Sequence, residues 1–188
     1  MIESEARRAA EIILSGGTIL YPTDTIWGIG CDATNPEAVK RIYEIKQRSD
    51  SKSMLVLMPG AEMLESYLKE VPEKAVEIIK VATKPTTIIY PGAKNLASGL
   101  VAEDGSVGIR ITSDPFCMQV MELTGLPIVS TSANTSGHPS PGTFAAIESI
   151  LLEEVDYVVN WRQDEKRPAV PSSIVKIDRQ GETFLLRP

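Results

Sequence analysis

Apolar residues recur along the chain in two rhythms, and the two rhythms alternate from one segment to the next. Near the start, five apolar residues recur at the spacing of a helix: Ala6, Ala9, Ala10, Ile13 and Leu14. This spacing predicts an amphipathic helix over residues 3–15, which the glycine pair at 16–17 ends. The short apolar run that follows predicts a strand over residues 18–23.

The same reasoning extends along the rest of the chain. It predicts further helices over residues 35–46, 72–83, 114–125 and 143–154, and further strands over residues 53–58, 86–91, 106–112, 126–132, 156–160, 172–177 and 183–188. Two of the helices carry start signals, since Asn35 and Asp114 are good N-cap residues and a proline follows each. Interleaved helices and strands indicate an α/β domain, and the closing run of strands favours a mixed sheet over a purely parallel one.

Length and composition narrow the possible functions. The chain has 188 residues, 43% of them hydrophobic, and a formal net charge of -6. It is long enough for one domain with a sizeable core, so residues 1–188 are predicted to form a single domain. An acidic balance argues against generic nucleic-acid binding, although a local basic pocket remains compatible with it.

The cysteines and the termini suggest where the protein works. Cys31 and Cys117 form neither a CxxC pair nor a disulfide framework, and with His138 as the only histidine there is no zinc-ligand spacing. The first residues are not typical of a signal peptide, and no run approaches 18 apolar residues. We therefore expect a cytoplasmic protein with no metal held by its own side chains and no membrane partner.

Two segments in the N-terminal half contain candidate site residues. "YPTDTIWGIG" places two threonines, an aspartate and a tryptophan after a strand, which a turn with a buried aromatic residue would explain equally well. The loop "KQRSDSK" gathers Lys46, Arg48 and Lys52 between a helix and a buried strand. One cation there would complement the helix dipole, but three favour a site for an anionic ligand.

Two further segments lie in the C-terminal half. "PIVSTSANTSG" runs from an apolar strand into small hydroxyl residues, whose short side chains and backbone N–H groups suit a phosphate or a sugar, although many loops are serine-rich for other reasons. Arg110 stands inside an apolar strand, where a charge is usually paired or at a site. Arg187, near the end of the chain, is weaker evidence. Neither a P-loop nor a Rossmann motif is present, and one histidine gives no Ser–His–Asp set.

Together, "YPTDTIWGIG", "KQRSDSK", "GIRIT" and "STSANTSGHPSP" resemble the YrdC family of threonylcarbamoyl-AMP synthases over residues 5–188. The resemblance implies a twisted, mixed and largely parallel sheet with flanking helices and a positively charged concave face. It also implies a nucleotidyltransferase that joins L-threonine, bicarbonate and ATP, with Mg²⁺, and releases pyrophosphate. The product would serve t6A modification of tRNA through downstream transfer proteins.

The resemblance assigns roles to individual residues. It implies that Lys46 and Arg48 are catalytic, and that the substrate is bound by Thr23, Thr25, Trp27, Arg110 and Ser172. It implies that the nucleotide is bound by Lys46, Arg48, Lys52, Ser132, Asn134 and Arg187. The sequence departs from the family at "TKPTTII", where Lys84 stands at a glycine position and Thr87 keeps the place of a threonine.

The implied chemistry needs cations more than acid–base groups. A carbamate formed from threonine and bicarbonate attacks the α-phosphate, and every reactant is negative, so cations and Mg²⁺ offset the repulsion. Two other interpretations remain. A module that binds double-stranded RNA or tRNA without synthase activity is disfavoured by the net charge of -6. A carbamoyl-adenylate domain, as in hydrogenase maturation proteins, normally belongs to a much longer chain.

Overall fold

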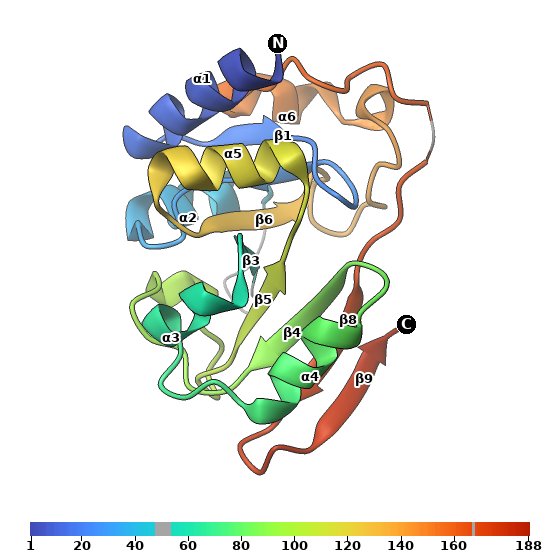
Figure 1. The fold of residues 1–188 in the computed structure, drawn as a ribbon. Coiled ribbons are helices and arrows are strands. Elements are labelled where there is room, and N and C mark those ends of the chain that lie inside the picture. The colour runs from blue at the N-terminus through green and yellow to red at the C-terminus, as the bar shows by residue number, and fades with distance from the viewer. Residues whose placement is uncertain (48–53, 167) are drawn as a thin grey trace.

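The computed structural model describes residues 1–47, 54–166 and 168–188 (Figure 1). The helices are α1 (Ile2–Leu14), α2 (Pro36–Ile45), α3 (Leu64–Tyr67), α4 (Glu73–Val81), α5 (Pro115–Thr124) and α6 (Ser149–Glu154), with 3-10 turns η1 (Ala61–Met63), η2 (Ser98–Leu100) and η3 (Phe144–Ala146). The strands are β1 (Ile19–Tyr21), β2 (Gly28–Gly30), β3 (Leu55–Met58), β4 (Thr86–Tyr90), β5 (Val107–Ile111), β6 (Ile128–Ser132), β7 (Tyr157–Val158), β8 (Ser173–Ile177) and β9 (Thr183–Arg187).

The strands form one sheet in the order β7-β1-β2-β6-β3-β5-β4-β8-β9. Within the described part of the chain three pairings are parallel (β1–β7, β3–β5, β4–β8) and five are antiparallel. The sheet is therefore mixed, as predicted, but the expectation that most strands run parallel needs correction. Strands joined by short connections, such as β1 with β2 and β8 with β9, pair antiparallel because a parallel pair needs a long crossover.

The start signals of two helices are confirmed. The Asn35 side chain accepts hydrogen bonds from the backbone N–H groups of Glu37 and Ala38 at the start of α2. The Asp114 side chain accepts from those of Phe116 and Cys117 at the start of α5. In both cases a side-chain oxygen satisfies N–H groups that have no partner inside the helix.

Two local predictions need correction. The glycine-rich "GIG" segment is a strand, β2, because a side chain at Gly30 would collide with the backbone of Val129 and the ring of Tyr21, and only glycine permits the approach. The helix predicted over residues 143–154 is interrupted. Ile147 and Glu148 have extended backbones between η3 and α6, and the Glu148 carboxylate binds a neighbouring loop instead.

Neighbouring residues of strand β1 enter two different hydrophobic cores. Ile19 and Tyr21 pack in the core beneath α1 and α5, whereas Leu20, between them, packs in the core that contains α2. Figure 1 shows α1 and α5 side by side over one face of the sheet. This division follows from the two-residue period of a strand, which sends successive side chains to opposite faces.

The face that α1 and α5 cover at one end of the sheet continues past them over β3, β5, β4 and β8. Along β4 and β5 the apolar residues Ile88 and Ile109 point to the opposite, helix-covered face. Thr87 and Arg110, a cross-strand pair, point to the face without a covering helix. The polar residues of this surface therefore sit where the sheet is not capped. None of the helices in the described ranges is long and apolar enough to cross a membrane.

Candidate active site

A cavity of about 960 Å³ lies on the uncapped face of the sheet. Its lining comes from segments far apart in the sequence: the β1–β2 turn, the start of β3, the residues of β4, β5 and β8 that face the cavity, the end of β6, and β9. Residues of all these segments meet only because the strand order places β6, β3, β5, β4, β8 and β9 next to one another. The cavity is large enough for a ligand of nucleotide size, since small-molecule sites typically measure roughly 300–1,000 Å³.

Arg110 is the buried cation of this cavity. It pairs with Thr87 on β4 and with Leu57 on β3 across the sheet, and its side chain is 3% exposed. Its Nη2 lies 3.0 Å from Oδ1 of Asp24. This ion pair is not aligned as a hydrogen bond, so Nε and Nη2 are buried donors without a hydrogen-bond acceptor in the described chain. A buried guanidinium with such donors is suited to a carboxylate or a phosphate.

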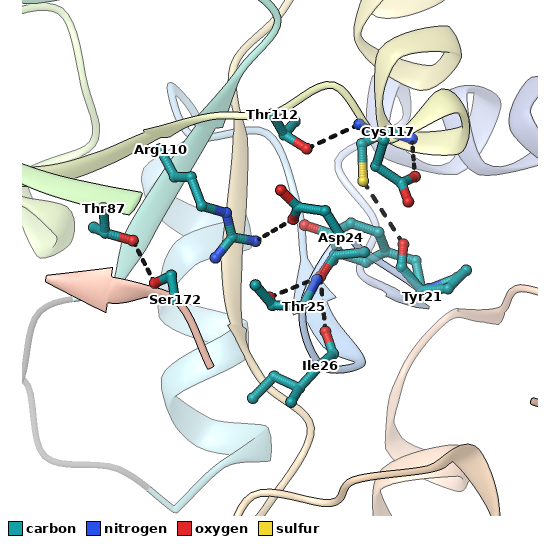
Figure 2. A network of polar contacts seen from close by, with 12 residues as sticks. Tyr21, Asp24, Thr25, Ile26, Thr87, Arg110, Thr112, Cys117 and Ser172 are labelled. Carbon is teal, nitrogen blue, oxygen red and sulfur yellow. Dashed lines mark hydrogen bonds and ion pairs between the residues drawn. The ribbon is translucent and has the colours of Figure 1, made fainter. Parts of the chain in front are cut away.

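Figure 2 shows Arg110 between Asp24 on one side and the Thr87–Ser172 pair on the other. The Thr87 and Ser172 hydroxyl oxygens are 2.8 Å apart, and both residues are buried. Arg187 donates from Nε to the backbone oxygen of Ser172 at 2.7 Å. Two arginines and two hydroxyls from four strands and loops therefore converge at one end of the cavity.

The two arginines affect each other electrostatically. Partial burial and the positive charge of Arg110 lower the pKa of Arg187 from its usual value. The Arg187 guanidinium nevertheless remains charged near neutral pH, because arginine titrates far above it. Two like charges held close together favour binding of an anion, which relieves their repulsion. We call Arg110, Arg187, Thr87 and Ser172 the arginine end of the cavity.

The β1–β2 turn is built by its own threonines. Thr23 Oγ1 donates to the backbone oxygen of Ile26 at 2.8 Å and accepts from the Thr25 N–H at 3.0 Å. Thr23 is buried in the turn, and Thr25 lines the cavity. Thr23 therefore shapes the segment that presents Thr25 and Trp27.

Trp27 forms a wall of the cavity. Only 5% of its surface is exposed, and its ring packs against Phe144 with centroids 4.8 Å apart and planes tilted by 52°. This tilted arrangement is among those that aromatic pairs prefer. Phe144 belongs to η3, so the wall joins the β1–β2 turn to the segment that follows the serine-rich loop.

The residues that follow β6 form the opposite end of the cavity, and we call residues 132–138 the 132–138 loop. Ser132 lines the cavity, together with Ser130 and Thr131 before it and Ser140 after the loop. Asn134 is buried, and its Nδ2 donates across the turn to the backbone oxygens of Thr135 and His138. The amide nitrogen of Asn134 is therefore used to hold the loop in shape.

Lys46, at the C-terminal end of α2, is fully buried beneath the same loop. Its ammonium donates to the backbone oxygens of Ser132 and Asn134, the latter at 2.6 Å. The backbone oxygen of Lys46 accepts from the Ser136 N–H at 2.9 Å. The end of α2 and the 132–138 loop are thus joined by side-chain and main-chain bonds.

The predicted site residues fall into three groups. Six of them line the cavity together: Thr25, Trp27, Arg110, Ser132, Ser172 and Arg187. Thr23, Lys46 and Asn134 lie behind it and support its walls. Arg48 and Lys52 fall outside the described residues, so the roles predicted for them stay predictions, as do the substrate contacts of the other nine.

Reasoning from the sequence missed the polar residues that line the cavity beyond Thr87. Lys176 and Asp104 also line the cavity and form an ion pair of 2.8 Å, and Ser106 donates to the same aspartate. A hint was present in "SIVKI", where Lys176 stands two residues after Ile174 and so shares its face of β8. The partner strand and loop could not be read from the sequence.

Acidic groups are sparse in the cavity. No set of three or more His, Cys, Asp or Glu side chains within the described ranges is arranged to hold a metal ion. A divalent cation bound here would therefore depend mainly on oxygens of the ligand, as Mg²⁺ commonly does when it accompanies a nucleotide triphosphate.

Comparison with known proteins adds independent evidence. The Sua5/YciO/YrdC family model, described as "Telomere recombination", matches residues 11–188. A threonylcarbamoyl-AMP synthase from Stutzerimonas stutzeri (strain A1501) is 30% identical over 179 residues, 95% of each chain. Another, from Pseudomonas paraeruginosa (strain DSM 24068 / PA7), is 34% identical over 161 residues, 85% of this chain and 86% of that protein.

Solved structures show the same architecture. The Sua5 protein of P. abyssi complexed with L-threonine superposes with a TM-score of 0.86 at 26% identity. The match covers 99% of this chain and 54% of that one, so this chain spans about half the length of that protein. E. coli YciO superposes with a TM-score of 0.83 at 24% identity over 98% of this chain and 89% of its own, which is a likeness of fold.

Proposed function

Because this chain belongs to the Sua5/YciO/YrdC family, we propose that it is an L-threonylcarbamoyl-AMP synthase. It takes L-threonine, bicarbonate and ATP, and it is a nucleotidyltransferase because the adenylyl group of ATP is transferred. The relatives that carry this name match at 30–34% identity over most of their length, which supports the assignment. The continuous nine-stranded sheet supports treating residues 1–188 as one catalytic domain.

The observation that carries the proposal is Arg110. Arg110 lines a cavity that also holds paired hydroxyl groups and an aromatic wall, and two of its buried donors have no hydrogen-bond acceptor among the described residues. Threonine has a carboxylate, a hydroxyl and a methyl group, and the site offers a partner for each. Arg110 binds the carboxylate, Thr25 or the Thr87–Ser172 pair binds the hydroxyl, and Trp27 contacts the methyl group.

The nucleotide then occupies the end of the cavity formed by Ser130, Ser132 and Ser140. Small hydroxyl side chains and backbone N–H groups allow close approach of phosphate and ribose oxygens. A Mg²⁺ ion brought in with ATP would be held largely by the phosphates, and it would supply positive charge that lowers the repulsion between the triphosphate and the anionic nucleophile.

The reaction proceeds in two steps. The threonine amine attacks bicarbonate, a C–N bond forms, water leaves, and the product is a carbamate. A carbamate oxygen then attacks the α-phosphorus of ATP, and the bond from that phosphorus to the pyrophosphate oxygen breaks. No side chain becomes covalently bound, so the protein contributes mainly position and positive charge.

The biological setting follows from the product. L-Threonylcarbamoyl-AMP is an activated acyl adenylate, so a transfer enzyme must consume it, and t6A modification of tRNA in the cytoplasm is the proposed use. A module that only binds RNA is disfavoured, because the net charge of -6 gives a weak electrostatic attraction for a polyanion.

The test is a pyrophosphate-release assay with ATP, Mg²⁺, bicarbonate and each of the twenty amino acids. We expect release that requires both threonine and bicarbonate, and a product whose mass equals threonylcarbamoyl-AMP. Release that is independent of threonine, or tight binding of double-stranded RNA at moderate salt without any release, would reject the proposal.

A further inference from the structure

Glu148 lies at the point where the helix predicted over residues 143–154 is interrupted. Its backbone is extended, with φ -63° and ψ 130°, between η3 and α6. It makes no capping hydrogen bond to α6. The carboxylate is directed instead to the 132–138 loop. A role outside its own helix explains this direction.

The two carboxylate oxygens bind the two sides of one turn. Oε2 accepts from the Thr135 N–H at 2.9 Å, and Oε1 lies 2.6 Å from Nδ1 of His138. Between these points Asn134 Nδ2 donates to the backbone oxygens of both residues. Glu148 therefore closes the loop from outside, whereas Lys46 binds it from inside through Ser132 and Asn134.

The charge of Glu148 suits this arrangement. Hydrogen bonds from Thr135, and then the contact with His138, lower the pKa of Glu148 to about 2. The carboxyl group is therefore ionised throughout the neutral range. Charge-assisted hydrogen bonds of this kind are shorter and stronger than neutral ones.

We propose that Glu148 is a positioning residue for the nucleotide, which it serves by holding the 132–138 loop in its binding conformation. The inference rests on the proposed function, since it assigns ATP to the end of the cavity that Ser132 and Ser140 line. Arg110 and Ser172 belong to the arginine end and make no contact with Glu148 within the described residues. Loosening the loop should therefore weaken ATP binding and leave threonine binding nearly unchanged.

Three variants separate this role from general stability. Glu148→Ala removes both contacts, and Glu148→Gln keeps an acceptor for Thr135 and so should rescue part of the loss. Glu153→Ala is the matched control, because Glu153 is an exposed carboxylate on α6 without a hydrogen bond or ion pair in the described part of the chain. Losing two hydrogen bonds should raise the KM for ATP about fivefold or more in Glu148→Ala.

The KM for threonine should stay within about twofold in the same variant. The Glu148 carboxylate contacts only the loop, so it contributes nothing to the binding of threonine. Amide hydrogen exchange within residues 132–138 should become faster in Glu148→Ala and stay unchanged in Glu153→Ala. An equal rise in both KM values, an unchanged KM for ATP, or unchanged exchange would overturn the proposal.

The outcome is distinguishable from failure of the proposed function. If the wild-type protein released no pyrophosphate with threonine, the function would be rejected, and calorimetric titration with MgATP would still decide the role of Glu148. If Glu148→Ala did not fold, Glu148→Gln and His138→Ala would each remove part of the contact. Equal ATP affinity in both of these variants and the wild type would overturn the proposal.

Discussion

At the arginine end of the cavity, Arg110 has two buried donors without hydrogen-bond acceptors in the described chain. At the other end, the backbone groups of the 132–138 loop are bound by Lys46, Asn134 and Glu148. One end is thus left incomplete for an anion to fill, and the other is already held in shape before any ligand arrives. Under the proposed function, threonine would supply the missing interactions at Arg110, whereas the nucleotide would meet a preformed surface.

The largest expected effect concerns the arginine end and its choice of amino acid. A site that hydrogen-bonds the threonine hydroxyl leaves its own buried groups unpaired when valine binds. Pyrophosphate release with valine should have a kcat/KM about 10⁴-fold below that with threonine. Serine retains the hydroxyl and loses one methyl group, so its penalty should be roughly 10–200-fold. Equal rates with valine and threonine would refute the assignment.

The next effect is expected from removing the incomplete cation itself. Arg110→Ala should lower kcat/KM for threonine by about 100-fold or more, because charged hydrogen bonds contribute about 1.5–3 kcal/mol each. It should also lower stability, because Asp24 loses its buried partner. Arg110→Lys, which keeps one charge without the planar fork, is the control. Steady-state kinetics with thermal unfolding of both variants separates the two losses, and wild-type kinetics in Arg110→Ala would count against the arginine end.

Lys46 tests the other end. Lys46→Ala should lower ATP affinity or turnover at least tenfold, about 1.4 kcal/mol, since a charged donor to the carbonyls of Ser132 and Asn134 is lost. Arg48→Ala, in the predicted anion-binding loop, should have an effect of the same size. Lys40→Ala, an exposed lysine on the same helix, is the control. Near-wild-type kinetics for both Lys46→Ala and Arg48→Ala would contradict the prediction that the basic segment "KQRSDSK" belongs to the site.

The Thr87–Ser172 hydrogen bond should have a smaller effect. Thr87→Val keeps the shape and removes the hydroxyl, so kcat/KM for threonine should fall about 2–10-fold, as expected for one neutral hydrogen bond of about 0.5–1.5 kcal/mol. Thr86→Val is matched in chemistry and lies on the other face of β4, beside a second cavity. A comparable loss in both variants would point to strand stability and away from substrate contact.

The smallest effect concerns pH and the 132–138 loop. The pKa of Glu148 is lowered from 4.5 to about 2, so its ionised form stabilises the folded state at pH values above the unfolded pKa, near 4.5. That contribution is lost as the pH falls toward 2, because protonation removes the negative charge that strengthens the contacts with Thr135 and His138. The difference in unfolding free energy between the wild type and Glu148→Gln should therefore shrink from pH 6 to pH 3, measured by urea unfolding. A constant difference would contradict the lowered pKa.

Much of the local structure was predictable from local signals. The caps at Asn35 and Asp114 act through residues two and three positions ahead, so the sequence carries the whole interaction. The strand rhythm of "TTIIY" and "VGIRI" likewise predicts which side chains share a face. It placed Thr87 and Arg110 on strands correctly. It could not state that they are cross-strand neighbours, because pairing between strands depends on their order in the sheet.

Other features depended on contacts between distant segments. Lys46 was predicted to bind an anionic ligand from a basic loop, but the 132–138 loop, about 86 residues further on, accepts hydrogen bonds from its ammonium. The break before α6 has no proline or glycine to announce it, and it becomes intelligible only through the contact of Glu148 with Thr135. Strand β2 was not predicted from the sequence. Its glycines permit a close approach to β1 and β6, and that approach exists only once the three strands lie together.

The sequence by itself determined most of the helices and strands, their mixed α/β arrangement and the set of motifs that resemble one family, because each of these depends on short-range spacing. Only the tertiary structure decided which of those motif residues line the cavity and which hold its walls. Thr25 lines the cavity, whereas Thr23, two residues before it, supports the turn; Ser132 and Asn134 differ in the same way. The physical reason is that burial and hydrogen-bond partners are set by strand order and loop packing, to which residues distant in the sequence contribute equally.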